Sequence, residues 1–271
     1  MGARALPQSQ AVRRDARNGR DVTVSATAST RAAHGGARPV VVVAGMAFEA
    51  RVAQGDGRDN VTAVYAARAD LLDRALTAAL DRGASGVISF GTAGGLAPDL
   101  EPGTLVIADA VDGPFGRIET DAAWSARLAE ALLASPLAAQ MRRGVEAAAG
   151  APLTGAADKA VLHAATGGAL AVDMESHMAA AAAAARGLPF AVCRAIVDPA
   201  WRSLPKAAMA GLRDDGTTAI WPVLRELARE PSQLGGLLRI AADARAARQS
   251  LAAARQVLVA SGAFFPQFFP Q

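Results

Sequence analysis

Residues 170–199 read LAVDMESHMAAAAAAARGLPFAVCRAIVDP, and this stretch predicts a strand–helix–strand unit. A short apolar strand at 169–172 leads into the polar run Asp-Met-Glu-Ser, which is followed by an alanine-rich helix that ends at a glycine. A second apolar strand covers 190–197 and runs into an Asp-Pro pair. In open α/β sheets, ligands bind beyond the carboxyl ends of strands. Glu175 and Asp198, which each follow a strand, are therefore candidates for one site.

Glu175 and Asp198 each also have an ordinary structural explanation. An acidic side chain in the first turn of a helix interacts favourably with the helix dipole. An Asp-Pro pair is a common turn signal. Glu175 and Asp198 alone leave the structural and the functional explanation open. Charged residues and glycines at the ends of strands upstream strengthen the functional one.

A buried strand near the start of the chain ends in glycine and charged residues. The run PVVVVA at 39–44 is typical of a strand covered on both faces of a parallel sheet. Gly45 follows, and a glycine at a strand end lets a ligand approach the backbone closely. Glu49 and Arg51 come next at the same edge. They are either site residues or solvated turn residues.

A third strand is predicted at 86–90 (GVISF), and a glycine-rich segment, GTAGGL at 91–96, follows it. We expect this segment to be a loop whose backbone N–H groups are free to bind an anion or a sugar. It matches neither the dinucleotide-binding pattern nor a P-loop.

The remainder of the chain reads as two further strands, at 61–66 and 104–111, and several helices, one of which, at 156–165, contains Lys159. An apolar stripe predicts a helix at 70–82, and 137–149 is also assigned to a helix. Three further helices rich in Ala, Leu and Arg are predicted at 217–230, 234–245 and 246–260. This order of elements predicts a three-layer α/β domain over 39–212, with a central mixed sheet flanked by helices. A helical C-terminal extension, 213–271, packs on the same domain.

Composition excludes several classes of protein. The chain is 52% hydrophobic and 20% charged, as globular proteins are. Its single cysteine, Cys193, excludes a disulfide framework, and its three histidines show no metal-ligand spacing. The net charge of +3 derives from arginines in residues 1–38, so it does not indicate nucleic-acid binding. Residues 1–38 are predicted to be a disordered basic extension. The Phe-rich end, 264–271, is not expected to be a helix, and as an exposed tail it would be an aggregation or contact patch.

The chain contains no apolar run near the ~20 residues of a membrane span. Residues 1–38 also lack the apolar core of a secretion signal. We therefore expect a soluble, cytoplasmic protein.

Three segments together resemble the nucleoside phosphorylase/nucleosidase superfamily. They are GMAFEAR at 45–51, SFGTAGGLAPDLEPGTLVIAD at 89–109, and AVDMES with FAVCRAIVDP within 171–199. The chain is most similar to the hopanoid-associated phosphorylases, through HAATGGALAVDMESHMAA at 163–180 and the DPA-x-R-x-LP-x-A run at 198–207. The resemblance covers about residues 39–258 and implies a three-layer phosphorylase/hydrolase-like fold.

The resemblance implies two catalytic residues. Asp198 matches the aspartate that protonates the purine at N7, and Glu49 matches the glutamate that positions or deprotonates an attacking water. The chemistry agrees with these roles, because neutral adenine leaves far more readily than its anion. A carboxylic acid can hold the necessary proton near neutral pH when burial raises its pKa.

The resemblance also implies a sugar site. Glu175 matches the glutamate that accepts hydrogen bonds from the ribose hydroxyls, and Met174 matches the methionine that packs under the sugar. Thr92 matches a Ser or Thr near the ribose or phosphate. Gly45 and Gly91 are expected to bind the substrate beside these residues.

Two positions depart from the family pattern. Adenosine-type nucleosidases often have Ser where this chain has Val197, so one adenine contact is missing. Hexameric phosphorylases grip phosphate with an arginine where this chain has Ser89. Arg51, together with Thr92, is the remaining candidate for binding phosphate. Phosphate and water both remain open as the nucleophile.

The function that the resemblance implies is cleavage of the N-glycosidic bond of an adenosine-bearing substrate. The hopanoid-associated match favours adenosylhopane, with adenine released during hopanoid biosynthesis. One alternative is an enzyme similar to methylthioadenosine/S-adenosylhomocysteine nucleosidases. An alternative of another class is a non-catalytic protein that binds a nucleoside or a lipid.

The expected partners follow from the same resemblance. They are a small-molecule or lipid nucleoside and further copies of the chain in a homo-oligomer, without nucleic acid. No metal or organic cofactor is implied, and inorganic phosphate would enter only as a cosubstrate. A lipid substrate would also require an apolar mouth to the site or access to a bilayer surface at the inner membrane face. The helices at 234–260 and the Phe-rich end are candidates for this role. The alternative is that they pack on the α/β core or in an oligomer interface.

Overall fold

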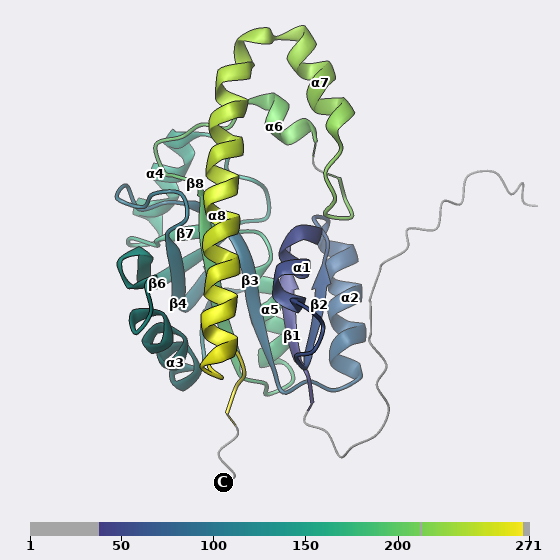
Figure 1. Cartoon of the computed structure of the whole chain (residues 1–271), viewed down its shortest axis with the longest axis vertical. Coiled ribbons are helices and arrows are strands. Elements are labelled where there is room, and N and C mark those ends of the chain that lie inside the picture. Colours follow the sequence, from purple (N-terminus) through teal and green to yellow (C-terminus); the bar gives the residue numbers. More distant parts are fainter. Residues whose placement is uncertain (1–37, 212, 268–271) are drawn as a thin grey trace, which may run out of the picture.

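The computed structural model describes residues 38–211 and 213–267, which form a central sheet with helices on both faces (Figure 1). The predicted α/β class with a mixed sheet is confirmed. The segment predicted to be disordered, 1–38, lies outside the described residues except for Arg38, as do the last four residues of the Phe-rich end.

Eight strands make up the central sheet. They are β1 (Val40–Ala44), β2 (Val61–Tyr65), β3 (Gly86–Gly95), β4 (Leu105–Gly113), β5 (Gly116–Glu119), β6 (Met141–Ala148), β7 (Ala171–Asp173) and β8 (Phe190–Asp198). Strand β8 pairs in parallel with β3 and antiparallel with β4. Because β3 also pairs with β7, β7 with β6, and β6 with β4, these five strands close a ring. Strands β1 and β2 extend the sheet beyond β3, and β5 extends it beyond β4.

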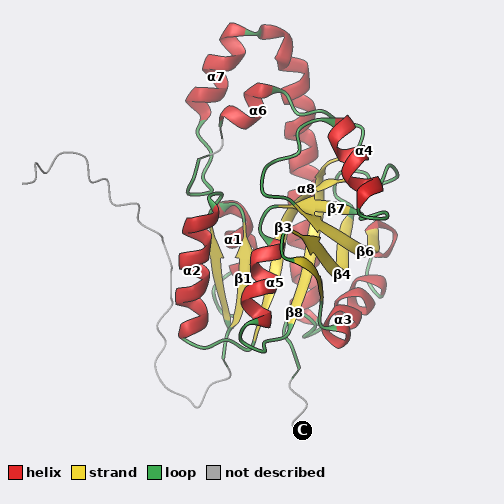
Figure 2. Cartoon of the chain, turned by 180° about the vertical axis from the view of Figure 1, so that it is seen from behind, coloured by secondary structure: helices red, strands yellow, loops and turns green. Residues whose placement is uncertain are grey.

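Helices cover both faces of the sheet. On one face lie α1 (Ala47–Gln54), α3 (Ala122–Leu133) and α8 (Leu234–Ala260), and on the other lie α2 (Ala69–Asp81) and α5 (Ser176–Ala184) (Figures 1 and 2). The valine run of β1 explains this arrangement, since Val42 packs toward the first set of helices and its neighbours Val41 and Val43 toward the second. All five residues of β1 are buried, as the uninterrupted apolar run predicts.

Two local predictions are wrong. Residues 137–149 do not form a helix, because 141–148 are the strand β6, preceded by the 3-10 helix η1 (Ala138–Gln140). The alanines in this segment suit a helix, but pairing with β4 and β7 outweighs that local preference. The segment 91–96 is not a loop, because β3 continues to Gly95.

The glycines at the end of β3 have a structural reason. The pairing register between β3 and β8 shifts between Ala93 and Gly94, and from there β3 pairs with β7. A Cβ atom at Gly95 would lie 3.2 Å from Cγ2 of Ile196 and 3.3 Å from Cα of Pro199. Gly95 therefore lets β3 pass close to the segment that carries Asp198.

The C-terminal region also differs from the prediction. The two helices expected at 234–245 and 246–260 are one helix of 27 residues, α8. Its second half is built into the core through Ala247, Leu251, Ala254 and Leu258. Phe264, at the start of the Phe-rich end, is fully buried and packs edge-on against Phe90, with 5.6 Å between the ring centroids.

A helical projection extends beyond one end of the sheet (Figures 1 and 2). It consists of α6 (Lys206–Ala210), α7 (Ile220–Arg229), the 3-10 helix η2 (Pro231–Gln233) and the first half of α8. Several large apolar side chains on it are exposed, and we call this group the apolar tip: Ile220, Trp221, Leu224, Leu234 and Leu238. Within the described ranges, no helix is long and apolar enough to cross a membrane.

Candidate active site

A cavity of about 230 Å³ lies where β1, β3, β7 and β8 end. Six residues predicted from the sequence line it: Gly45, Glu49, Thr92, Met174, Glu175 and Asp198. The apolar residues that line it include Leu153, Leu204 and Met209, the last of which belongs to α6. The cavity thus brings together residues from three distant parts of the sequence and borders the helical projection.

Glu49 is held rigidly beneath the cavity. It lies in the first turn of α1 and is only 2% exposed. Its Oε2 accepts hydrogen bonds from the backbone N–H groups of Gly45 and Met46, both at 3.0 Å. Its Oε1 accepts from the backbone N–H of Thr92 at 2.8 Å and from the Thr92 hydroxyl at 2.6 Å. The carboxylate therefore links the ends of β1 and β3.

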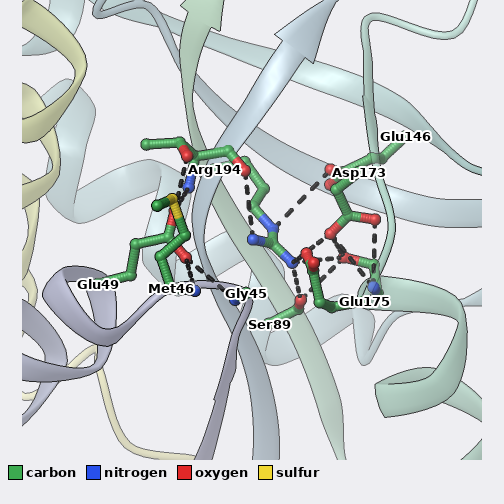
Figure 3. A network of polar contacts seen from close by, with 10 residues as sticks. Gly45, Met46, Glu49, Ser89, Glu146, Asp173, Glu175 and Arg194 are labelled. Atoms are coloured by element: carbon green, nitrogen blue, oxygen red, sulfur yellow. Dashed lines mark hydrogen bonds and ion pairs between the residues drawn. The ribbon is translucent and has the colours of Figure 1, made fainter. Parts of the chain in front are cut away.

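Arg194 lies at the centre of the site, between Glu49 on one side and Asp173 and Glu175 on the other (Figure 3). Its side chain, on β8, is fully buried. Nη2 forms an ion pair with Asp173, approaches Oε2 of Glu175 at 3.3 Å and donates to the Ser89 hydroxyl at 2.7 Å. Sequence reasoning assigned no role to this arginine. The feature of the sequence that could have indicated its role is the presence of an arginine inside the apolar run FAVCRAIV.

The carboxyl groups around Arg194 outnumber the charge available to neutralise them. Glu146 on β6 is also fully buried, 4.0 Å from Nε of Arg194, and neither of its oxygens has a hydrogen-bond partner among the described residues. Burial raises the pKa of Glu146 well above its usual range, with the charge of Asp173 adding to the effect. Burial likewise raises the pKa of Glu175 to about 8, against the opposing effect of Arg194. Burial therefore favours the protonated forms of Glu146 and Glu175.

Asp198 has a buried lysine behind it. Lys159, on α4 (Ala156–Ala165), is fully buried, and its Nζ lies 2.5 Å from Oδ2 of Asp198. Burial raises the pKa of Asp198, while the Lys159 ammonium opposes the rise. Sequence reasoning placed Lys159 on this helix but gave it no function, because its partner lies 39 positions away in the sequence.

Two glycines allow the charged side chains to approach the backbone. A Cβ atom at Gly45 would lie 2.6 Å from Oε1 of Glu175. One at Gly91 would lie 2.6 Å from Nη1 of Arg194 and 2.8 Å from Oε2 of Glu49. Gly91 does not line the cavity, so its place is behind the charged network rather than against a substrate.

Arg51 does not belong to the cavity. It lies in the last turn of α1 with an exposed side chain and is not among the lining residues. Of the described residues that line the cavity, none is Lys or Arg. Nor do the described His, Cys, Asp and Glu residues form a group of three or more that could hold a metal ion. Burial raises the pKa of the Cys193 thiol to about 12, as suits a structural thiol.

Comparisons with known proteins agree with this architecture. A family model described as the Phosphorylase superfamily matches residues 10–210. A 5′-methylthioadenosine/S-adenosylhomocysteine nucleosidase from S. pneumoniae is 20% identical, with a TM-score of 0.57 over 81% of this chain and 99% of its own. The corresponding nucleosidase from Neisseria meningitidis is 16% identical, with a TM-score of 0.61 over 83% and 99%.

A third structural relative has a different named substrate. Futalosine hydrolase from Helicobacter pylori is 17% identical, with a TM-score of 0.60 over 82% of this chain and 97% of its own. No curated protein sequence matches the chain. The structural likenesses, at 20% identity or less, bear on the fold, whereas the family model spans most of the sequence. The chain belongs to the Phosphorylase superfamily and is an enzyme of the nucleoside phosphorylase/nucleosidase type.

Proposed function

We propose that the protein cleaves the N-glycosidic bond of an adenosine-bearing substrate and releases adenine, with water as the nucleophile. The observation that carries this proposal is the placement of Asp198 in the same cavity as Glu49 and Glu175. One carboxyl group protonates the leaving base, and the others bind the sugar and the attacking water.

Asp198 is the proposed general acid. Bond cleavage passes through an oxocarbenium-like state, and a neutral leaving base lowers its energy. Asp198 is 7% exposed, and burial raises its pKa toward the range in which a carboxyl group holds a proton. The proton moves from the carboxyl oxygen to N7 of the purine as the glycosidic bond breaks.

Glu175 and Met174 form the proposed ribose site. Both line the cavity next to Gly45, whose missing side chain leaves room for the Glu175 carboxyl group. That carboxyl group is hydrogen-bonded to Arg194, which fixes its orientation for contact with the ribose hydroxyls.

Glu49 and Thr92 are the proposed nucleophile site. Three of the four hydrogen bonds to Glu49 come from backbone groups, and the fourth comes from the Thr92 hydroxyl, which can rotate. A water molecule that takes the place of this hydroxyl at Oε1 would be aligned and deprotonated by the carboxylate. The lack of Lys and Arg among the described lining residues favours water over phosphate, because a phosphate would have no cation to bind it there.

A lipid-linked adenosine, adenosylhopane, is the proposed substrate. The similarity to the hopanoid-associated phosphorylases suggests it, and the apolar tip supports it. Leu204 and Met209 on the apolar cavity wall lie at the base of the helical projection, and α6 packs against α7, which carries Ile220 and Trp221. A hydrocarbon chain that leaves the cavity past these side chains would meet apolar surface rather than water. The alternative is a small soluble substrate such as methylthioadenosine, which would leave the apolar tip unused.

The test is adenine release from adenosylhopane and from methylthioadenosine, each with and without phosphate, with mass spectrometry of the sugar product. We expect adenine and a free ribosyl lipid, formed equally without phosphate, and a fall of at least ~100-fold in Asp198→Asn. A phosphorylated sugar formed only with phosphate would overturn hydrolysis. Turnover of methylthioadenosine alone would overturn the lipid substrate. Tight adenosine binding without turnover of any substrate would leave a binding protein.

A further inference from the structure

Lys159 is the one buried residue of α4, and its surroundings are unusual for a lysine. Lysine is almost never fully buried unless it is paired. Its Nζ lies 2.5 Å from Oδ2 of Asp198, 3.2 Å from the Asp198 carbonyl oxygen, 3.0 Å from that of Pro199 and 3.2 Å from that of Arg202. The ammonium therefore holds both the carboxyl group and the backbone that follows it.

The position of Lys159 separates it from the substrate. Asp198 lines the cavity and Lys159 does not, so the ammonium contacts the acid from behind. Nζ contacts Oδ2, which leaves Oδ1 as the other oxygen of a carboxyl group that lines the cavity. Oδ1 is therefore the oxygen available to a base bound in the cavity.

We propose that Lys159 is a positioning residue for Asp198. Lys159 directs Oδ1 of Asp198 toward the leaving base and limits how firmly the carboxyl group holds the proton that it donates. This inference rests on the proposed role of Asp198 as the general acid. Lys159 itself does not touch the substrate, and its effect on the reaction passes through the carboxyl group.

The charge of Lys159 offsets the effect of burial. An acid that is too weak releases its proton too slowly, and the most effective general acid has a pKa near the working pH. Burial alone would weaken Asp198 as an acid, and Asp243 on α8 acts in the same direction. Lys159 is the opposing cation, because the nearby Arg202 is paired with Asp243 at 2.7 Å. The other carboxyl groups at the cavity, those of Glu49, Asp173 and Glu175, bring no positive charge to Asp198.

The predicted signature is a displaced pH profile in Lys159→Met. A general acid loses activity above its pKa, so removing the neighbouring positive charge should move the alkaline limb of kcat/KM to higher pH by about 1–3 units. The loss at neutral pH should fall on kcat and leave KM nearly unchanged, because Lys159 does not line the cavity. Lys159→Arg, which keeps the charge, should keep the limb near its wild-type position.

The matched control is Arg143→Met. Arg143 also forms an ion pair at 2.5 Å, with Asp109, but both side chains are about 40% exposed and neither lines the cavity. The pH profile of kcat/KM for Arg143→Met should match that of the wild type. If Lys159→Met does not fold, Lys159→Gln provides the same test, because its amide can still donate to the backbone carbonyls while the charge is absent.

A second measurement separates this inference from the proposed reaction. The Asp198 carboxyl carbon is followed by 13C NMR without substrate and assigned by its loss in Asp198→Asn. We expect its titration midpoint to rise in Lys159→Met. A raised midpoint in a protein that releases no adenine supports the pairing and overturns the proposed function. Adenine release with neither the midpoint nor the limb displaced overturns the role of Lys159.

Discussion

Replacing Glu175 with glutamine should stabilise the protein at alkaline pH. Burial and the neighbouring carboxylates raise the pKa of Glu175 from 4.5 to about 8 in the folded protein. A group whose pKa is raised on folding favours the folded state below its unfolded pKa, and this advantage is lost as the pH rises through the folded value. Wild-type stability should therefore decline between pH 4.5 and pH 8, relative to a variant with a neutral amide at this position.

The magnitude follows from the two pKa values. The cost of keeping Glu175 protonated is about 1 kcal/mol at pH 5 and about 4 kcal/mol at pH 8. The free energy of unfolding of Glu175→Gln, measured relative to wild type, should thus increase by about 3 kcal/mol over this interval. Loss of the 3.3 Å contact with Arg194 adds a constant that does not depend on pH.

The assay is urea-induced unfolding at pH 5, 6.5 and 8. Glu130→Gln, an exposed substitution on α3, is the matched control and should show no change across the series. A stability difference for Glu175→Gln that stays constant with pH, or that shrinks as the pH rises, would refute the reasoning. Glu175 would then be ionised in the folded protein, with Arg194 outweighing burial.

Three further substitutions test the cavity, the core and the apolar tip. Gly45→Ala places a methyl group 2.6 Å from Oε1 of Glu175 and should raise KM for adenosine substrates, so an unchanged KM in steady-state assays would contradict the ribose site. Leu251→Ala leaves a cavity at a fully buried position on α8 and should lower the free energy of unfolding in urea by about 2–5 kcal/mol. Leu238 is 64% exposed on the same helix, so Leu238→Ala should lower it little, and equal effects of the two substitutions would contradict the packing of α8. Trp221→Ser should slow turnover of adenosylhopane but not of methylthioadenosine, with the exposed Leu133→Ser as control, and an equal effect on both substrates would remove the apolar tip from substrate binding.

The parts of the fold that the sequence predicted are those with an unambiguous local pattern. The valine run of β1 has one structural solution, a strand covered on both faces, and the structure has it. The alternation from strand to helix around Glu175 placed that residue and Asp198 at strand ends, and both line one cavity. The segment 141–148 could not be predicted in this way, because its alanines suit a helix locally and the pairing with β4 and β7 that makes it a strand depends on residues far away in the sequence.

The charged partners in the site lay beyond sequence reasoning for a similar reason. Arg194 meets Asp173 because β8 lies beside β3 and β3 turns onto β7, a route that no local pattern reveals. Lys159 meets Asp198 because α4 packs behind the end of β8. In both cases a charged residue in an apolar segment was visible, but the identity of its partner depended on packing between segments that are distant in the sequence.

Helix α8 has two unlike halves, and this division bears on how the enzyme can change over time. At 27 residues it is about 40 Å long, with one half built into the core and the other in the helical projection. Substitutions in the outer half alter a surface that does not carry Asp198, Glu49 or Glu175. On the proposed function, the preference for what is attached to the nucleoside can therefore change while Asp198, Glu49 and Glu175 stay the same, so that substrate range and chemistry can evolve separately.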